Sequence, residues 1–142
     1  MTVKNINGVP TRMLEEVFWR NGSLFVRVAE GDDYFVYEVT SCPRPKVMPK
    51  LSDCVMPKAG DTGNFEIITK RIVPKSSLDK NTEYEQIEKY PSNEEWGSFA
   101  WTYTQWDNVA RAVRKKFHGK PFYDEKDREK IMAYLNDMSL YN

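Results

Sequence analysis

The chain has 142 residues, of which 40% are hydrophobic and 30% charged, a composition typical of a globular domain and too apolar for a disordered chain. Lysine plus arginine and aspartate plus glutamate number 21 each, so no overall charge attracts nucleic acid or an anionic membrane. No segment reaches the length of a signal sequence or a membrane span, and Cys42 and Cys54 form no CxxC pair. We therefore expect a single cytoplasmic domain over residues 1–142 with two reduced thiols, although a bridge between them stays open.

The first half of the chain predicts strands. Residues 12–41 are rich in valine and aromatic residues and contain turn signals at Asn21-Gly22 and at residues 30–33, which is typical of a three-stranded antiparallel meander. An Asn-Gly pair favours a two-residue type I′ turn, and this turn fixes the register of the first hairpin. The predicted cross-strand pairs are Trp19 with Leu24, Val17 with Val26, Val28 with Phe35, Val26 with Tyr37 and Leu24 with Val39.

Residues 42–62 predict a long loop rich in proline and lysine, because prolines interrupt any strand there. The loop contains the repeated tetrapeptide Val-Met-Pro-Lys, at residues 47–50 and 55–58. Chance duplication and a contact loop are both consistent with this repeat. Beyond the loop, residues 64–73 and 82–90 predict two further strands, separated by a turn.

The C-terminal part predicts helices. Thr104 and Asp107 resemble a capping box that opens a helix ending near His118, before Gly119. Its apolar stripe is expected to pack on the sheet and contains Trp106, Val109, Ala110, Val113 and Phe117. A second helix is expected from about Asp124, with Ile131, Met132, Leu135 and Met138 buried. The fold class is therefore α+β, with an antiparallel sheet of about four to six strands packed by two C-terminal helices.

Few residues suggest catalysis or a cofactor. The single histidine, His118, lies where a helix C-terminus would favour a cation, and neither cysteine belongs to a nucleophile motif. The sequence contains no P-loop, GxGxxG, HExxH or EF-hand pattern. We expect no enzyme, no cofactor and no metal site.

The charges separate along the chain although they cancel overall. Residues 43–58 contain four cations and one anion, whereas residues 79–95 contain six anions and two cations. The candidate acidic surface for binding a partner consists of Glu83, Glu85, Glu88, Glu94 and Glu95. The candidate basic surface for binding DNA or RNA consists of Lys46, Lys50, Lys58, Arg111, Arg114, Lys115 and Lys116. Both sets are also consistent with ordinary solvated faces.

The most distinctive segment is residues 90–103, a turn that leads into an aromatic strand. With the helix that follows, it resembles small uncharacterised proteins of bacteriophages and mobile elements, in which a YPSxExxGxxAWTY-type segment precedes an amphipathic helix. The resemblance covers roughly residues 34–118. The matching residues are Tyr90, Pro91, Ser92, Glu94, Trp96, Gly97, Ala100, Trp101, Thr102 and Tyr103. The Pro/Lys-rich loop and the segment after Gly119 depart from the shorter pattern of those proteins. The resemblance implies that the protein originates from a phage or mobile element, and it implies no particular activity.

These observations favour a non-enzymatic phage or mobile-element accessory protein that binds and inhibits a host protein or nucleoprotein complex, as anti-CRISPR proteins inhibit defence nucleases. The first alternative is an accessory protein that binds DNA or RNA directly through the basic loop and helix. The second is a metal-dependent hydrolase with a carboxylate-bound magnesium ion. None of the three requires a membrane.

Overall fold

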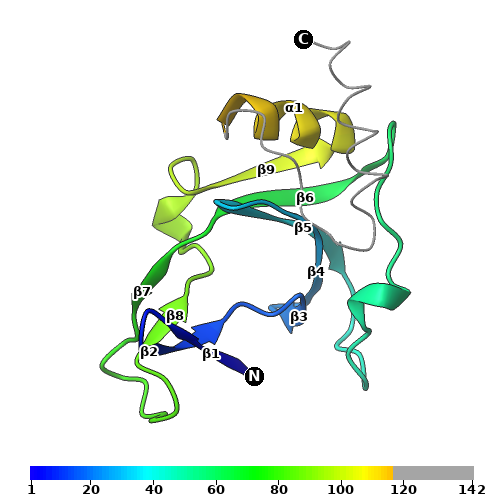
Figure 1. Ribbon diagram of the computed structural model, residues 1–142. Coiled ribbons are helices and arrows are strands. Elements are labelled where there is room, and N and C mark those ends of the chain that lie inside the picture. The colour runs from blue at the N-terminus through cyan, green and yellow to red at the C-terminus, as the bar shows by residue number, and fades with distance from the viewer. Residues whose placement is uncertain (117–142) are drawn as a thin grey trace.

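The computed structural model describes residues 1–116, which form two β-sheets and one α-helix (Figure 1). In chain order the strands are β1 (Thr2–Ile6), β2 (Val9–Met13), β3 (Val17–Arg20), β4 (Ser23–Glu30), β5 (Tyr34–Ser41), β6 (Thr62–Thr69), β7 (Ile72–Pro74), β8 (Gln86–Glu88) and β9 (Ala100–Gln105). Two short 3₁₀ helices, η1 (Leu51–Asp53) and η2 (Asn93–Glu95), lie in the connections, and α1 spans Trp106–Lys116. The α+β class is confirmed.

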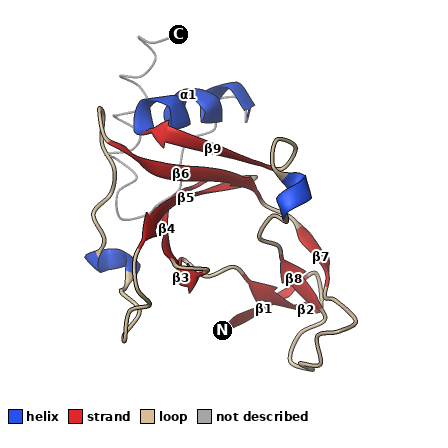
Figure 2. Ribbon diagram, turned by 180° about the vertical axis from the view of Figure 1, so that it is seen from behind, coloured by secondary structure: helices blue, strands red, loops and turns tan. Residues whose placement is uncertain are grey.

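The strands are divided between a large and a small sheet (Figure 2). The large sheet has the order β3-β4-β5-β6-β9 and is antiparallel throughout. The small sheet has the order β1-β2-β8-β7, and its β2 and β8 run parallel. Both views show the large sheet curving away from α1 towards the small sheet, so that the two sheets face a common interior.

The first predicted hairpin is confirmed. β3 pairs with β4 in the expected register, with Trp19 opposite Leu24 and Val17 opposite Val26. Asn21 and Gly22 have φ values of 50° and 83°, as a type I′ turn requires. The turn sequence therefore set this register correctly.

The predicted register of the next hairpin is wrong by two residues beside the turn, where Glu30 and not Val28 lies opposite Phe35, and by one residue further along the strands. Val26 lies opposite Glu38 and Leu24 opposite Thr40, and the register shifts again between Arg27 and Ala29. The turn is therefore shorter than expected, and a β-bulge at Val28 brings Val28 and the following Ala29 into the same buried cluster beneath α1. Simple alternation cannot place two consecutive residues on one face.

The start of the predicted meander is also corrected. Residues 9–13 form β2 of the small sheet, and the meander begins only at Val17. β2 pairs with β1 across an Asn7-Gly8 turn in which both residues have positive φ, at 52° and 85°. This hairpin has the same turn signal as the first one.

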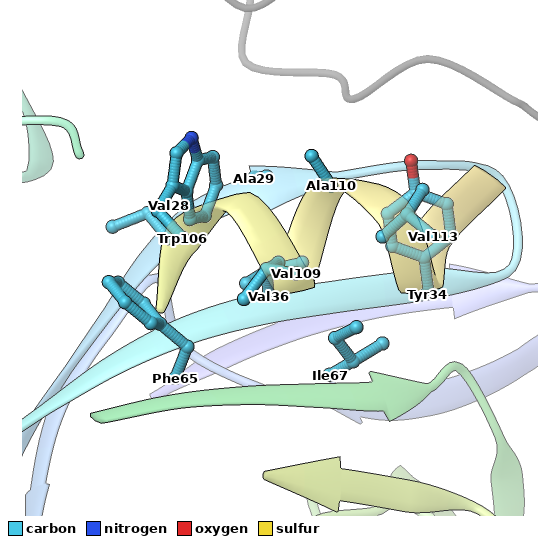
Figure 3. Close-up of a cluster of buried hydrophobic side chains, with 10 residues drawn as sticks. All are labelled: Val28, Ala29, Tyr34, Val36, Phe65, Ile67, Trp106, Val109, Ala110 and Val113. Atoms are coloured by element: carbon cyan, nitrogen blue, oxygen red, sulfur yellow. The ribbon is translucent and has the colours of Figure 1, made fainter. Parts of the chain in front are cut away.

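Helix α1 covers one face of the large sheet (Figure 3). Its buried side chains are Trp106, Val109, Ala110 and Val113, as the helical stripe predicts. They pack on Val28, Ala29, Tyr34, Val36, Phe65 and Ile67. The opposite face of the same sheet buries Phe25, Phe35, Tyr37, Ile68 and Ala100. The central strands are thus buried on both faces.

The predicted start of the helix needs a correction. Thr104 lies within β9, and α1 begins directly after that strand at Trp106, whose N–H donates to Asp61 O at 3.0 Å. The predicted capping box at Thr104 is therefore wrong, because the sheet extends two residues further than expected. Phe117, His118 and the predicted second helix lie outside the described residues.

Candidate functional site

The structure separates the acidic candidates into exposed and internally bonded residues. Glu83 and Glu85 are exposed in the connection before β8, and Glu94 is exposed in η2. In Figure 1 this connection and η2 lie at opposite ends of β8, so the exposed carboxylates do not form one continuous row. The other two members, Glu88 and Glu95, have their carboxylates engaged within the chain.

Glu88 joins β8 of the small sheet to the connection between β2 and β3. Only 8% of the residue is exposed, and its Oε1 accepts the backbone N–H of Leu14 at 3.0 Å. Burial raises the pKa of Glu88 above its ordinary value, and the Leu14 N–H opposes this shift. The structure therefore gives Glu88 a bridging contact between elements and not a place on the surface.

Glu95 closes a capping box that the sequence reading missed. Ser92 donates to Glu95 Oε1 through its backbone N–H at 2.9 Å and its hydroxyl at 3.0 Å. Lys89 Nζ lies 2.7 Å from the same carboxylate, and Arg71 pairs with its second oxygen. The Lys89 and Ser92 donors lower the pKa of Glu95 to about 2. The Ser-x-x-Glu spacing was the signal that would have predicted this motif.

Residues 75–85, here called the acidic loop, form a closed loop between β7 and β8. Its two ends meet, because the N–H of Lys75 donates to Glu85 O at 3.2 Å, and Lys75 Nζ contacts Asn81 O. Within the loop the Glu83 N–H donates to Asn81 Oδ1 at 2.8 Å. Closed ends and internal bonding define an Ω-loop, a type of loop that is frequently functional.

Tyr84 fastens the acidic loop to the small sheet. The residue is only 2% exposed, and its hydroxyl donates to Asp79 and accepts from Arg12 Nη1 at 3.3 Å. The guanidinium of Arg12 lies 5.3 Å from the centre of the Tyr84 ring, and Lys75 Nζ lies 5.4 Å from it. The Tyr84 hydroxyl lowers the pKa of Asp79, with help from the Asn81 N–H. Side chains of β2 and of the loop itself thus hold the loop in one shape.

An apolar side chain projects from this ordered loop. Leu78 is 85% exposed, and its N–H donates to Ser76 Oγ at 3.2 Å. Glu83 and Glu85 are exposed later in the same loop. The acidic loop therefore presents one large apolar residue, two carboxylates and the exposed Lys80 on a backbone that is already ordered, and the carboxylates outnumber the exposed cation.

The basic candidates do not converge on one surface. Lys46 and Lys58 are exposed in the loop of residues 42–62, and Lys50 lines the cleft between the sheets. This loop meets α1 at the beginning of the helix, where the Gly60 N–H donates to an Asp107 oxygen at 3.1 Å. The basic residues of the helix lie in its second half, away from that junction (Figure 1), with Arg111 and Lys115 exposed and Arg114 half-buried. The Lys116 side chain lies outside the described atoms.

A cleft of about 520 Å³ lies between the two sheets, and three of the charged residues that line it contact one another. Arg27, Glu30, Lys70 and Glu88 all line it. Lys70 Nζ lies 2.6 Å from one Glu30 oxygen, and Arg27 Nη1 lies 3.6 Å from the other. Arg27 also donates to Tyr37 Oη and to a backbone carbonyl. Such mutual pairing is typical of a structural network that joins two sheets.

A second hollow, here called the Tyr90 pocket, has a volume of about 540 Å³ and lies on the interior face of the large sheet. Its wall is the distinctive segment of the sequence, which contributes Tyr90, Pro91, Ser92, Asn93 and Trp96. The sheet contributes Arg20, Asn21, Ser23, Phe25, Val39, Asn64 and Glu66. The motif that the sequence singled out therefore lines a cavity as well as packing in the core.

The Tyr90 pocket contains a buried carboxylate. Glu66 is 8% exposed, and its Oε1 accepts the Tyr90 hydroxyl at 2.5 Å. Burial raises the pKa of Glu66, while the Tyr90 hydroxyl and the Arg20 charge oppose the shift. Burial and the bond to Glu66 also raise the pKa of Tyr90. The signal in the sequence was a single charged residue inside the apolar run Phe65 to Ile68.

The fold and its surface define an α+β protein with two sheets, an ordered acidic loop and a polar pocket. No family model, curated protein or solved structure matches the chain. Among residues 1–116, no helix has the length and hydrophobicity that crossing a bilayer requires. Within that same range no group of three or more histidine, cysteine or acidic residues is arranged to hold a metal, and both cysteines are free.

Proposed function

We propose that this protein is a phage or mobile-element accessory protein that binds a host protein or nucleoprotein complex in the bacterial cytoplasm and inhibits it. The observation that carries the proposal is the acidic loop, which presents Leu78, two carboxylates and a single exposed lysine, Lys80, on an internally bonded backbone. The resemblance of residues 90–103 to phage and mobile-element proteins supports the proposed origin.

An ordered loop of this kind supports binding because little conformational freedom remains to be lost on association. Leu78 is exposed over 85% of its surface, so a partner that covers it removes a large apolar side chain from water. Glu83 and Glu85 then select a partner of opposite charge, and they accelerate encounter with it. The partner surface that fits this loop is basic with an apolar recess, as found where a nuclease holds nucleic acid.

Direct binding of DNA or RNA has less support from the geometry. The basic loop meets α1 at the opposite end of the helix from Arg111 and Lys115, so the cations do not follow one phosphate backbone. Partner binding and direct nucleic-acid binding predict different results for the same preparation. Direct binding through phosphate contacts produces a gel shift on DNA or RNA that weakens steeply as the salt concentration rises.

The test is affinity capture from a lysate of the host bacterium with matched variants. We expect the wild-type protein to retain a stoichiometric partner. Leu78→Asp and the double variant Glu83→Lys/Glu85→Lys should each retain at least tenfold less of that partner than the wild type does. Val55→Asp and Asp53→Lys are the controls, since Val55 is 87% exposed and Asp53 is exposed in a different loop. The captured protein should lose activity when the wild-type chain is added and keep it with the loop variants.

Two results would overturn the proposal. One is equal capture by the wild type and the loop variants, which would place the contact elsewhere. The other is the absence of any stoichiometric partner together with a salt-sensitive gel shift on DNA or RNA. The second result would favour the nucleic-acid alternative, and variants of Arg111 and Lys115 would then be expected to weaken the shift.

A further inference from the structure

We propose that the Tyr90 pocket is a binding site for a guanine base, presented by a nucleotide or a single-stranded nucleic acid. The inference is independent of the acidic loop, because the two sites share no residue. It rests on the shape of the pocket, on the free acceptor capacity of Glu66 and on the flat side chains that surround it.

The size and walls of the pocket suit a nucleotide. Its volume of about 540 Å³ lies within the range of roughly 300–1,000 Å³ that small-molecule sites occupy. One wall is the β3–β4 hairpin, another is formed by the interior faces of β4, β5 and β6, and the third is the segment that precedes β9. Elements far apart in the sequence therefore converge around one opening.

Glu66 gives the pocket an acceptor that the fold does not fully use. Its Oε1 accepts the Tyr90 hydroxyl, and its Oε2 has no hydrogen-bond partner within residues 1–116. A carboxylate has about four acceptor positions, so most of the capacity of Glu66 is available to a ligand. A buried carboxylate with spare acceptors favours a ligand that presents two adjacent N–H donors.

Flat side chains lie beside that carboxylate. The Arg20 guanidinium covers the Tyr90 ring at 4.7 Å from its centre, and the Trp96 ring lies 6.4 Å from it at 67°, so the flat groups that a ligand would meet are the exposed Arg20 plane and the half-buried Trp96 ring. Aromatic rings and arginine planes are the surfaces on which proteins stack unpaired bases. Asn21, Asn64 and Asn93 add amide groups around the opening, which can bond a sugar or a base edge.

The charge balance favours a neutral base over a cationic side chain. Arg20 and Glu66 are the two charged residues that line the pocket in the described part of the chain, and they have opposite signs. The positive charge of Arg20 disfavours the entry of an arginine or a lysine from a partner protein, whereas a neutral base gains a stacking surface from it.

Guanine is the base whose edge matches the carboxylate. Its N1–H and N2 amino group are adjacent donors, and both oxygens of one carboxylate can accept them in parallel. Adenine and cytosine place an acceptor beside their amino group, and uracil offers a single ring N–H between two carbonyls. A carboxylate, which only accepts when ionised, therefore selects guanine among the four bases.

The experiment is calorimetric titration of the full chain with the four nucleoside monophosphates and with inosine monophosphate, supported by tryptophan fluorescence. All five probes share the ribose phosphate, so differences between them report the base. We expect guanosine monophosphate to bind most tightly, and inosine monophosphate, which lacks the N2 amino group, to bind about tenfold more weakly because one charge-assisted hydrogen bond is lost.

Three variants assign the binding to the pocket. Glu66→Gln keeps an acceptor for the Tyr90 hydroxyl. It should lower the affinity for guanosine monophosphate by about tenfold or more and remove the preference for guanosine over inosine monophosphate. Trp96→Leu should lower the affinity for all five nucleotides by about fivefold or more, because a stacking surface is lost. Glu88→Gln is the matched control, since Glu88 is also 8% exposed but lines the other cleft, and it should bind as the wild type does.

Urea unfolding of each variant establishes that it is folded before binding is compared. Equal affinity for all five probes, or guanosine binding that Glu66→Gln leaves unchanged, would overturn the assignment. Binding of arginine amide as tight as that of guanosine monophosphate would overturn it too, and would identify the pocket as a site for a partner's guanidinium group.

Discussion

The Tyr37 hydroxyl joins β5 of the large sheet to the connection between β2 and β3, so its removal tests the interior network. It donates to Glu15 O at 2.8 Å and accepts from Arg27 Nε and Nη2 at 3.2 and 2.9 Å. Tyr37 is fully buried, and burial raises its pKa although Arg27 opposes the shift. Tyr37→Phe keeps the ring and leaves both the carbonyl and the guanidinium without this partner.

We expect Tyr37→Phe to lower the free energy of unfolding by about 3 kcal/mol. Each unsatisfied buried group costs roughly 1–3 kcal/mol, and the value is higher when the group is charged. For a chain of this size the loss corresponds to a decrease in Tm of roughly 6–12 °C. Arg27 still donates to Leu14 O at 2.8 Å, which limits the loss to this range.

The assay is urea unfolding followed by tryptophan fluorescence and circular dichroism. The control is Tyr103→Phe, because Tyr103 is half-buried and its hydroxyl has no hydrogen-bond partner within residues 1–116. The control should change stability by less than about 0.5 kcal/mol. Equal stabilities for Tyr37→Phe and the wild type would refute the view that the Arg27–Tyr37 network stabilises the fold by holding the β2–β3 connection against the large sheet.

Three further predictions concern stability. Gly31→Ala should severely destabilise the fold, because a Cβ at Gly31 would overlap the buried Tyr34 ring, and thermal unfolding measures the loss. Glu88→Gln should gain stability relative to the wild type as the pH rises from about 4 to about 8. The raised pKa of Glu88 stabilises the folded wild type fully at pH values below the pKa of Glu88 in the unfolded chain, and this stabilisation is lost as the pH rises through its pKa in the folded chain. Urea midpoints that differ by a constant amount across this range would contradict that sign. Glu95→Gln should be less stable than the wild type above pH 4.5 and should converge with it as the pH falls towards 2, the folded pKa of Glu95, and parallel unfolding curves would argue against this.

Local turn chemistry predicted part of the fold well. The Asn21-Gly22 pair fixed the β3–β4 register, and the same dipeptide at Asn7-Gly8 would have predicted the β1–β2 hairpin had its short flanking strands been recognised. The bulge at Val28 was not predictable, because it depends on packing against α1, a helix far along the chain. The parallel pairing of β2 with β8 also joins distant segments without a local signal.

The candidate sites were predictable only in part. Composition identified Glu83 and Glu85, which are exposed, but it gave no indication that Glu88 lies inside. Burial of that kind follows from sheet pairing and not from charge counts. Glu66 was visible as a charged residue in an apolar strand, yet its role in a pocket depends on Tyr90, which the fold brings to it from 24 residues away. The closure of the acidic loop likewise needed the Tyr84 contacts, which span distant segments.

Site-specific photo-crosslinking inside the host cell tests the central claim most directly. A photoreactive phenylalanine analogue replaces Leu78 in one preparation and Val55 in another, since the two side chains are 85% and 87% exposed. The account predicts one defined crosslinked species from position 78, which excess wild-type protein competes away, and none from position 55. Identical crosslinking from both positions, or crosslinking from position 55 alone, would contradict binding through the acidic loop.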